Sequence, residues 1–198
     1  MKALIIVDVQ NDFCKNGSLA VPDADSIISL INHKINNDFS VIVMTQDWHP
    51  QDHRSFASNN PGQEVFSIGT LDGNPQIMWP DHCIQNTKGA EFHKDLDINF
   101  AKIIQKGMDK TVDSYSAFFD NNGKNKTELS DYLKEIGVDE VDICGLALDV
   151  CVYYTAMDAI KEGFKTTVFA NLTRGIKQED IDKTYDELLK AGVIIRFD

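Results

Sequence analysis

The stretch VDICGLALDVCV, residues 141–152, decides the fold of this chain. Its apolar beginning is typical of a buried strand, and Gly145 and Ala147 interrupt the run before a helical pattern over residues 149–163. Cys151 therefore lies where a strand, a tight turn and a helix meet, and the partial positive charge of a helix N-terminus favours a thiolate. Buried structural cysteines are commoner than reactive ones, so a nucleophile is indicated only if other groups converge there.

Strands and helices alternate along most of the chain. Short apolar, β-branched runs predict strands at residues 3–9, 41–45, 101–105, 141–144, 166–169 and 193–197. Helical patterns predict helices at residues 25–36, 127–137, 149–163 and 178–191. This alternation predicts an α/β fold, a three-layer sandwich in which a mainly parallel sheet carries helices on both faces. The connection from residue 48 to about residue 100 is the exception, and its length is typical of a functional segment.

Composition limits the class of protein. With 198 residues and 42% hydrophobic side chains, the chain can bury a sizeable core, and no linker-like segment divides it. We therefore expect a single domain over residues 1–198. The formal net charge of −12 argues against nucleic acid or an anionic membrane as a partner. A neutral or small polar substrate fits this charge better.

The cysteines and the apolar runs indicate the compartment. The apolar run at the start is cut short by Asp8, which makes it too brief for a secretory signal, and no later run is long enough to span a bilayer. We therefore expect a cytoplasmic protein whose four cysteines are reduced thiols. None of them forms a CxxC pair, which excludes the usual zinc-knuckle and redox-pair interpretations.

Reactive side chains follow several of the predicted strands. Asp8 closes the first strand, Lys106 follows the third and Cys151 follows the fourth. Ligands of open parallel sheets bind beyond the carboxyl ends of the strands, so these side chains are candidates for one site. Taken singly, a turn-forming Asp and a solvated Lys are the ordinary interpretations. Together, a nucleophile, a carboxylate and a cation are the set that amide hydrolysis by a thiol requires.

A second group of side chains indicates a metal site. Asp47 and His49 follow the second strand two residues apart, so their side chains leave the same face of an extended chain and can share one ion. His82 in the long connection is a candidate third ligand, and His53 is a candidate fourth. Two imidazoles and a carboxylate suit Zn²⁺, Fe²⁺ or Mn²⁺, and the spacing does not choose among them. Asp and His are also common in surface loops, which is the alternative interpretation.

Five segments, in order along the chain, resemble the nicotinamidases (pyrazinamidases) of the isochorismatase-like cysteine hydrolase superfamily. They are VDVQNDFCKNGSLAVP at 7–22, QDWHPQDHRSFAS at 46–58, MWPDHCIQNTKGAEFH at 78–93, VDSYSAFFDN at 112–121 and GLALDVCV at 145–152. They extend over most of the chain, which makes the match more specific than any single motif. The resemblance implies the isochorismatase-like hydrolase fold.

The resemblance also implies the roles of side chains. It assigns a catalytic triad to Asp8, Lys106 and Cys151, and metal ligation to Asp47, His49 and His82. It assigns an oxyanion hole to the backbone N–H groups of Ala147 and Cys151, with a cis peptide bond before Ala147. It implies a substrate pocket walled by Phe13, Leu19, Trp79 and Tyr115. The cofactor would be one divalent transition metal ion, Zn²⁺ in first place and Fe²⁺ or Mn²⁺ as alternatives.

The activity implied is hydrolysis of nicotinamide to nicotinic acid and ammonia through a cysteine thioester, in NAD salvage, with pyrazinamide as a second substrate. The chain departs from the family at Leu148, where a Thr is usual, so a hydroxyl that could bond within the nucleophile turn is missing. Three alternatives stay open: another amide or ureido hydrolase of the superfamily, a metal-centred hydrolase with Cys151 as a bystander, and a catalytically silent binding module. The oligomeric state is also open, and a homo-oligomer is compatible with the sequence.

Overall fold

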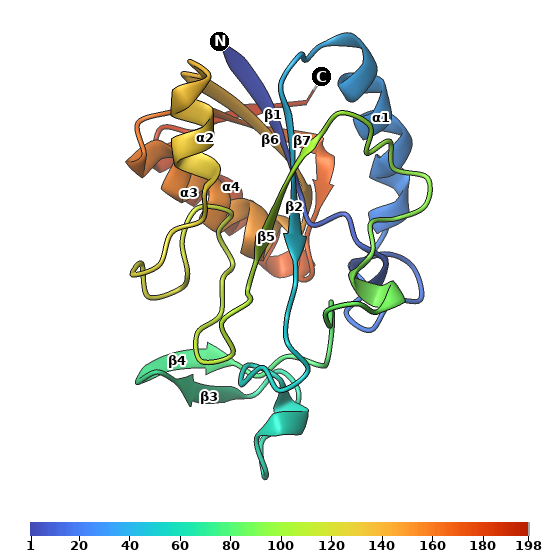
Figure 1. Ribbon diagram of the computed structural model, residues 1–198, viewed down its shortest axis with the longest axis vertical. Coiled ribbons are helices and arrows are strands. Elements are labelled where there is room, and N and C mark those ends of the chain that lie inside the picture. The colour runs from blue at the N-terminus through green and yellow to red at the C-terminus, as the bar shows by residue number, and fades with distance from the viewer. Residues whose placement is uncertain (198) are drawn as a thin grey trace.

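The computed structural model describes residues 1–197, and a six-stranded sheet, parallel at every pairing, forms its centre (Figure 1). The strands lie in the order β5-β2-β1-β6-β7-β8. Their bounds are Lys2–Val7 for β1, Ile42–Asp47 for β2, Lys102–Lys106 for β5, Glu140–Leu146 for β6, Lys165–Arg174 for β7 and Ile194–Arg196 for β8. An antiparallel hairpin of β3 (Ile68–Leu71) and β4 (Asn74–Ile77) stands beyond the carboxyl end of the sheet.

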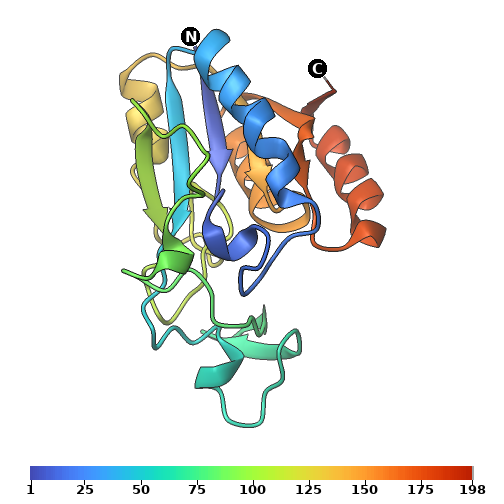
Figure 2. The same ribbon diagram turned by 90° about the vertical axis from the view of Figure 1, so that its right-hand side faces the viewer.

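Helices cover both faces of the sheet (Figures 1 and 2). On one face lies α1 (Ile28–Asn37), and on the other lie α2 (Leu129–Glu135), α3 (Tyr153–Lys161) and α4 (Gln178–Lys190). Successive side chains of β1 point to opposite faces of the sheet, so the strand contacts both helix layers. Leu4 and Ile6 pack on the side of α1, and Ile5 packs on the side of the other three helices. Short 3₁₀ helices span Asn11–Phe13, Ala24–Ile27, Ala57–Asn59 and Lys88–Ala90.

The order of the strands reverses between β1 and β6. From β1 the chain passes through α1 to β2, which neighbours β1 on the side away from β6. From β6 it passes through α3 to β7, which neighbours β6 on the side away from β1. Right-handed crossovers in opposite directions place α1 and α3 on opposite faces of the sheet. A crevice is expected beyond the carboxyl ends of the strands at such a reversal. Asp8 and the nucleophile turn, residues 145–152, follow the two strands that border it.

The predicted three-layer α/β sandwich is confirmed, with three local differences. The strand predicted at 166–169 extends to Arg174, and its last residues pair with β6 across a shift of register. The helix predicted at 149–163 begins as a single π-helical turn (η5, Leu148–Val152). The hairpin of β3 and β4 lies in the long connection, where no strand was predicted. Within residues 1–197, no helix is both long and apolar enough to cross a membrane.

Candidate active site

A buried ion cluster joins the carboxyl ends of three strands. Nζ of Lys106 at the end of β5 lies 2.9 Å from Oδ2 of Asp8, and it donates a hydrogen bond to Oδ1 of Asp47 at the end of β2. The same ammonium donates to the carbonyl oxygen of Ser114 at 2.9 Å and lies 3.6 Å from Sγ of Cys151. Lys106 is only 2% exposed and Cys151 only 7%. The structure therefore brings together the carboxylate, cation and thiol that the sequence indicated.

Burial controls the protonation of this cluster. It raises the pKa of Asp8 to about 6, against the opposing effect of the Lys106 ammonium. It also raises the pKa of the Cys151 thiol well above its usual value, although Lys106 opposes this shift too. The sequence indicated that a helix N-terminus favours the thiolate, whereas burial acts in the opposite direction and is the largest effect on this pKa. Cys151 rests as a thiol, with a carboxyl group nearby that can accept its proton.

Lys106 keeps its charge in spite of its burial. Desolvation disfavours the ammonium, but the carboxylates of Asp47 and Asp8 outweigh this and raise the pKa of Lys106 well above its usual value. Asp47 shows the converse behaviour, because Lys106 and neighbouring imidazoles overcome its burial and lower the pKa of its carboxyl group. A permanent positive charge is therefore fixed beside the sulfur.

The nucleophile turn, residues 145–152, depends on close backbone packing. Gly145 has φ of 108°, and a Cβ at this position would overlap the backbone of Val7 on β1. The peptide bond between Leu146 and Ala147 is cis, as the resemblance implied. The carbonyl oxygen of Ala147 accepts hydrogen bonds from the N–H groups of Val150 and Val152 at 3.1 and 3.0 Å. These bonds close the turn through the backbone.

Leu148 occupies the position where the family usually has Thr, and its side chain is buried in the core beneath α3. The neighbouring Asp149 ties the turn to another loop, because its carboxylate accepts hydrogen bonds from the N–H groups of Ile176 and Lys177 at 2.9 and 3.0 Å. In this chain the turn is held by backbone hydrogen bonds and by the Asp149 carboxylate. The role of Asp149 was not predicted, since nothing in the local sequence shows its partner.

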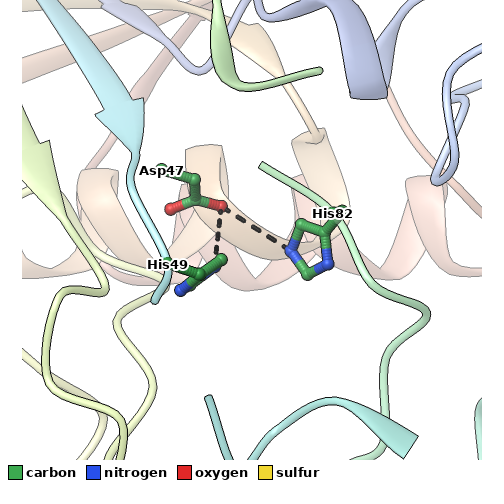
Figure 3. Close-up of side chains that lie close together, drawn as sticks. All are labelled: Asp47, His49 and His82. Carbon is green, nitrogen blue, oxygen red and sulfur yellow. Dashed lines mark ion pairs between the residues drawn. The ribbon is translucent and has the colours of Figure 1, made fainter. Parts of the chain in front are cut away.

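Asp47, His49 and His82 form a compact group of candidate metal ligands (Figure 3). Oδ2 of Asp47 lies 3.7 Å from Nε2 of His49 and 4.0 Å from Nε2 of His82. Each imidazole bonds through its other nitrogen to a backbone carbonyl at 2.8 Å, His49 to Gly107 and His82 to Pro80. A ring that donates from Nδ1 leaves a lone pair on Nε2, which is how imidazole binds metals.

The chemistry of this group fits a divalent cation. Nε2 of His49 is buried and has no hydrogen-bond partner within the described part of the chain, so a ligand is needed to satisfy it. Burial, followed by repulsion from His49, lowers the pKa of His82 to about 4, which keeps its ring neutral and able to ligate. Two buried carboxyl groups, those of Asp8 and Asp47, contact the ammonium of Lys106, and a third, that of Asp113, lies with His49 and His53. A dipositive ion would balance the excess of negative charge.

His53 lies beside this group with a different arrangement. Its ring centroid is 4.5 Å from that of His49, and burial lowers its pKa, which favours the neutral ring. Nδ1 of His53 accepts the backbone N–H of Ser55 at 3.2 Å and contacts the Ser55 hydroxyl at 2.8 Å. Nε2 of His53, like that of His49, is buried without a hydrogen-bond partner in the described part of the chain, and His53 forms a second possible ligand group with His49 and Asp113.

A small cavity opens beside the thiol and the candidate metal ligands. Its lining includes all four residues that the resemblance assigned to a substrate pocket: Phe13, Leu19, Trp79 and Tyr115. Asp47, His82, Ala147 and Cys151 also line it, as do three residues that were not predicted: Asp113, Val150 and Ile176. A small planar ligand in this cavity would lie between the sulfur and the imidazoles.

The isochorismatase domain model matches residues 2–196, so the chain belongs to the isochorismatase family. The nicotinamidase of Escherichia coli (strain K12) is 43% identical over 200 residues, which cover 98% of this chain and 93% of that protein. The crystal structure of yeast nicotinamidase bound to the inhibitor nicotinaldehyde aligns with a TM-score of 0.96 at 38% identity and covers 100% of both chains. The pyrazinamidase of Pyrococcus horikoshii in complex with zinc aligns with a TM-score of 0.82 at 38% identity and covers 99% of both chains. The resemblance carried by the five segments is confirmed.

Proposed function

We propose that this chain is a nicotinamidase that hydrolyses nicotinamide to nicotinic acid and ammonia, and so acts in NAD salvage. The observation that carries the proposal is the buried cluster of Cys151, Asp8 and Lys106, whose thiol reaches a small cavity that Asp47 and His82 also line. The identity to curated nicotinamidases over nearly the whole chain supports it. Hydrolysis of pyrazinamide belongs to the same proposal, because this compound keeps the ring nitrogen meta to the carboxamide.

In this proposal Cys151 is the nucleophile and Asp8 moves its proton. The carboxylate of Asp8 takes the proton from Sγ as the sulfur attacks the carboxamide carbon, and it returns that proton to the departing ammonia. The C–S bond of a thioester forms and the C–N bond breaks. Water then attacks the thioester, with Asp8 as the base, and releases the acid and the free thiol. Lys106, 3.6 Å from Sγ, stabilises the negative charge on sulfur during attack.

The nucleophile turn supplies the oxyanion hole in the same proposal. Ala147 and Cys151 both line the cavity, and their backbone N–H groups are the donors assigned to the carbonyl oxygen as it becomes negative. A donor of this kind contributes about 3 to 4 kcal/mol to the stability of a transition state. Phe13, Leu19, Trp79 and Tyr115 enclose the ring of the substrate and exclude water from it.

Asp47, His49 and His82 would hold one divalent transition metal ion, with Zn²⁺ preferred over Fe²⁺ or Mn²⁺ because two nitrogens and a carboxylate suit it. When bound there, the ion supplies a Lewis acid for the pyridine nitrogen of the substrate. Asp47 and His82 line the cavity together with Cys151, so a ring held at the ion would lie within reach of Sγ. His53 packs against the ring of His49 and is assigned a place at the rim of this site, outside the three ligands.

A cytoplasmic location is part of this proposal. All four cysteines are free thiols, which is typical of a reducing compartment. The substrate needs no partner macromolecule, and neither nucleic acid nor membrane is proposed as one. A homo-oligomer stays compatible with the chain.

Ammonia release from nicotinamide, measured on purified protein before and after chelation, tests the proposal. We expect turnover that falls on chelation and returns when Zn²⁺, Fe²⁺ or Mn²⁺ is added back. Absence of ammonia release under all these conditions would contradict a nicotinamidase. Turnover that chelation leaves unchanged would keep the thiol hydrolase and remove the metal from its function.

A further inference from the structure

Gln76 is an unusual residue for its position in the chain. It belongs to β4 of a hairpin whose residues are mostly exposed, yet only 5% of its own surface is accessible. Its Nε2 donates to the hydroxyl of Tyr115 at 2.8 Å and to Oδ2 of Asp113 at 3.2 Å. The same Nε2 lies 2.9 Å from the carbonyl oxygen of the adjacent Ile77, so its two hydrogens are shared among three acceptors. A buried amide with this many partners is held in one orientation.

The partners of Gln76 form a wall between two hollows. Tyr115 and Asp113 line the proposed substrate pocket, and both also line a larger and more open cavity on the outer side. Gln76 lines the outer cavity, together with residues of the hairpin and α3. Tyr115 and Asp113 therefore form a wall between the two cavities. Its inner side faces the proposed substrate pocket, and the Gln76 amide contacts it on the outer side.

The hydrogen bonds of Tyr115 explain what the amide contributes. Its hydroxyl accepts one hydrogen bond from Gln76 and another from Nε1 of Trp79 at 3.1 Å. Both acceptor positions of the phenol oxygen are then filled, and the rings of Tyr115 and Trp79 pack edge to face at 6.1 Å. Without the amide, Tyr115 would lose one of its two donors and Oδ2 of Asp113 would lose its bond to Nε2.

We propose that Gln76 is a positioning residue that determines which carboxamides the pocket accepts. By holding Tyr115 and Asp113 in place, it fixes the size of the inner pocket and separates it from the outer cavity. Ring-substituted carboxamides are rejected because the wall cannot move outward. The inference rests on the proposed function, since it names the specificity of the same site.

Three variants test the inference. Gln76→Met keeps the length of the side chain and removes its donors, Gln76→Ala also removes the volume that closes the wall, and Asn74→Ala is the matched control. Asn74 is on the same strand, lines the same outer cavity and donates an amide hydrogen bond to Asn122 at 2.8 Å, but it does not line the inner pocket. Each variant is assayed in the presence of metal with nicotinamide and with 5-methylnicotinamide, after its melting curve has been compared with that of the wild type.

We expect Gln76→Met to raise KM for nicotinamide about 5- to 10-fold, because one net hydrogen bond that orders the wall is lost. Its kcat should change less than about threefold, since no hydrogen bond joins Gln76 to Asp8, Lys106 or Cys151. Gln76→Ala should lower the ratio of kcat/KM for nicotinamide to kcat/KM for 5-methylnicotinamide by about 10-fold. This is the effect of one methyl group in a fitted pocket. The control should keep the wild-type preference.

Two results would overturn the inference. One is that, in both Gln76 variants, KM for nicotinamide and the preference for nicotinamide over 5-methylnicotinamide stay within about twofold of the wild-type values. The other is a parallel loss on both substrates, or failure of both variants to fold, which would make Gln76 a structural residue only. A wild type without activity on nicotinamide would instead contradict the proposed function, so the two failures are distinguishable.

Discussion

At the scale of single residues, the exclusion of water from Asp8 decides how the site works. A solvated Asp would have a pKa near 4 and would be a weak base at neutral pH. Burial raises the pKa of Asp8 to about 6, and the Lys106 ammonium together with the Thr45 hydroxyl limits the rise. Oγ1 of Thr45 donates to Oδ1 of Asp8 at 2.6 Å. The result is a carboxylate that is ionised at neutral pH and still basic enough to accept a thiol proton.

The pH dependence of kcat/KM should follow this carboxylate. Because the base must be ionised, we expect activity to fall as the pH is lowered through about 6. Thr45→Val keeps the shape of the side chain and removes the hydroxyl that lowers the pKa of Asp8. The acid limb of the profile of kcat/KM against pH should therefore move to higher pH. A limb at the same pH in both proteins would show that Asp8 is not the group that titrates. Thr70→Val, on the exposed hairpin, is the control for a general effect of the substitution.

The ring nitrogen of the substrate gives a second prediction at this scale. Benzamide keeps the carboxamide and the flat ring but lacks the nitrogen that the Asp47, His49 and His82 site is proposed to anchor. We expect kcat/KM for benzamide to be lower than for nicotinamide by a factor on the order of 10² to 10³, below the roughly 10⁴ seen where a buried partner is left wholly unpaired. Pyrazinamide should remain a substrate. Comparable values for benzamide and nicotinamide would indicate a general aromatic amidase.

At the scale of elements, Asp149 joins the nucleophile turn to the loop that begins α4. Its carboxylate accepts two backbone N–H groups, and one of them belongs to Ile176, which lines the pocket. Hydrogen bonds to a charged acceptor contribute about 1.5 to 3 kcal/mol each, more than neutral ones do. The position of the pocket wall therefore depends on an acidic residue that does not line the pocket.

Asp149→Ala should accordingly lower the free energy of unfolding by about 2 kcal/mol or more and raise KM for nicotinamide. Denaturant titration and steady-state kinetics measure the two effects. Glu179→Ala, in the first turn of α4, is the control, because this side chain is exposed. An Asp149→Ala protein with wild-type stability and KM would show that the loop holds its position without the carboxylate.

The hairpin is the element that the sequence interpretation missed, although a signal for it exists. Asp72 and Gly73 have φ of 47° and 80°, and an Asp-Gly pair between two extended segments is a strong local indicator of a two-residue hairpin turn. The flanking residues IGTL and NPQI lack a clear alternation of apolar and polar side chains, because half of them are exposed and only two are buried. The end of β7 was missed for a similar reason, since its polar NLTR ending gives no buried-strand pattern.

At the scale of the whole molecule, the topology explains why so much of the site was predictable. Asp8, Asp47, Lys106 and the turn before Cys151 all follow parallel strands, so their positions in sequence place them at one edge. The roles of Gln76, Asp113 and Asp149 were not predictable, because each depends on a partner far away in sequence across a loop whose path no local pattern specifies. The protonation state of Cys151 was also missed, since it depends on burial that only the folded chain shows.

The folded protein as a whole should carry about one divalent metal ion per chain. We expect His82→Ala to lose most of this metal, because it removes one of the three proposed ligands, and His53→Ala to retain most of it, because His53 is not among those three ligands in the proposal. Elemental analysis of the purified variants measures the occupancy. Full occupancy in His82→Ala, or equal losses in both variants, would be incompatible with the three-ligand assignment.

The central claim is that the thiol of Cys151 performs the hydrolysis, and turnover of nicotinamide by Cys151→Ala tests it most directly. We expect ammonia release to disappear while nicotinamide still binds, since the aromatic walls and the imidazoles remain. Cys144→Ala, a buried cysteine on β6 outside the cavity, should keep its activity and lose stability on the order of 1 kcal/mol. Ammonia release by Cys151→Ala well above the background of a mock purification would contradict the account.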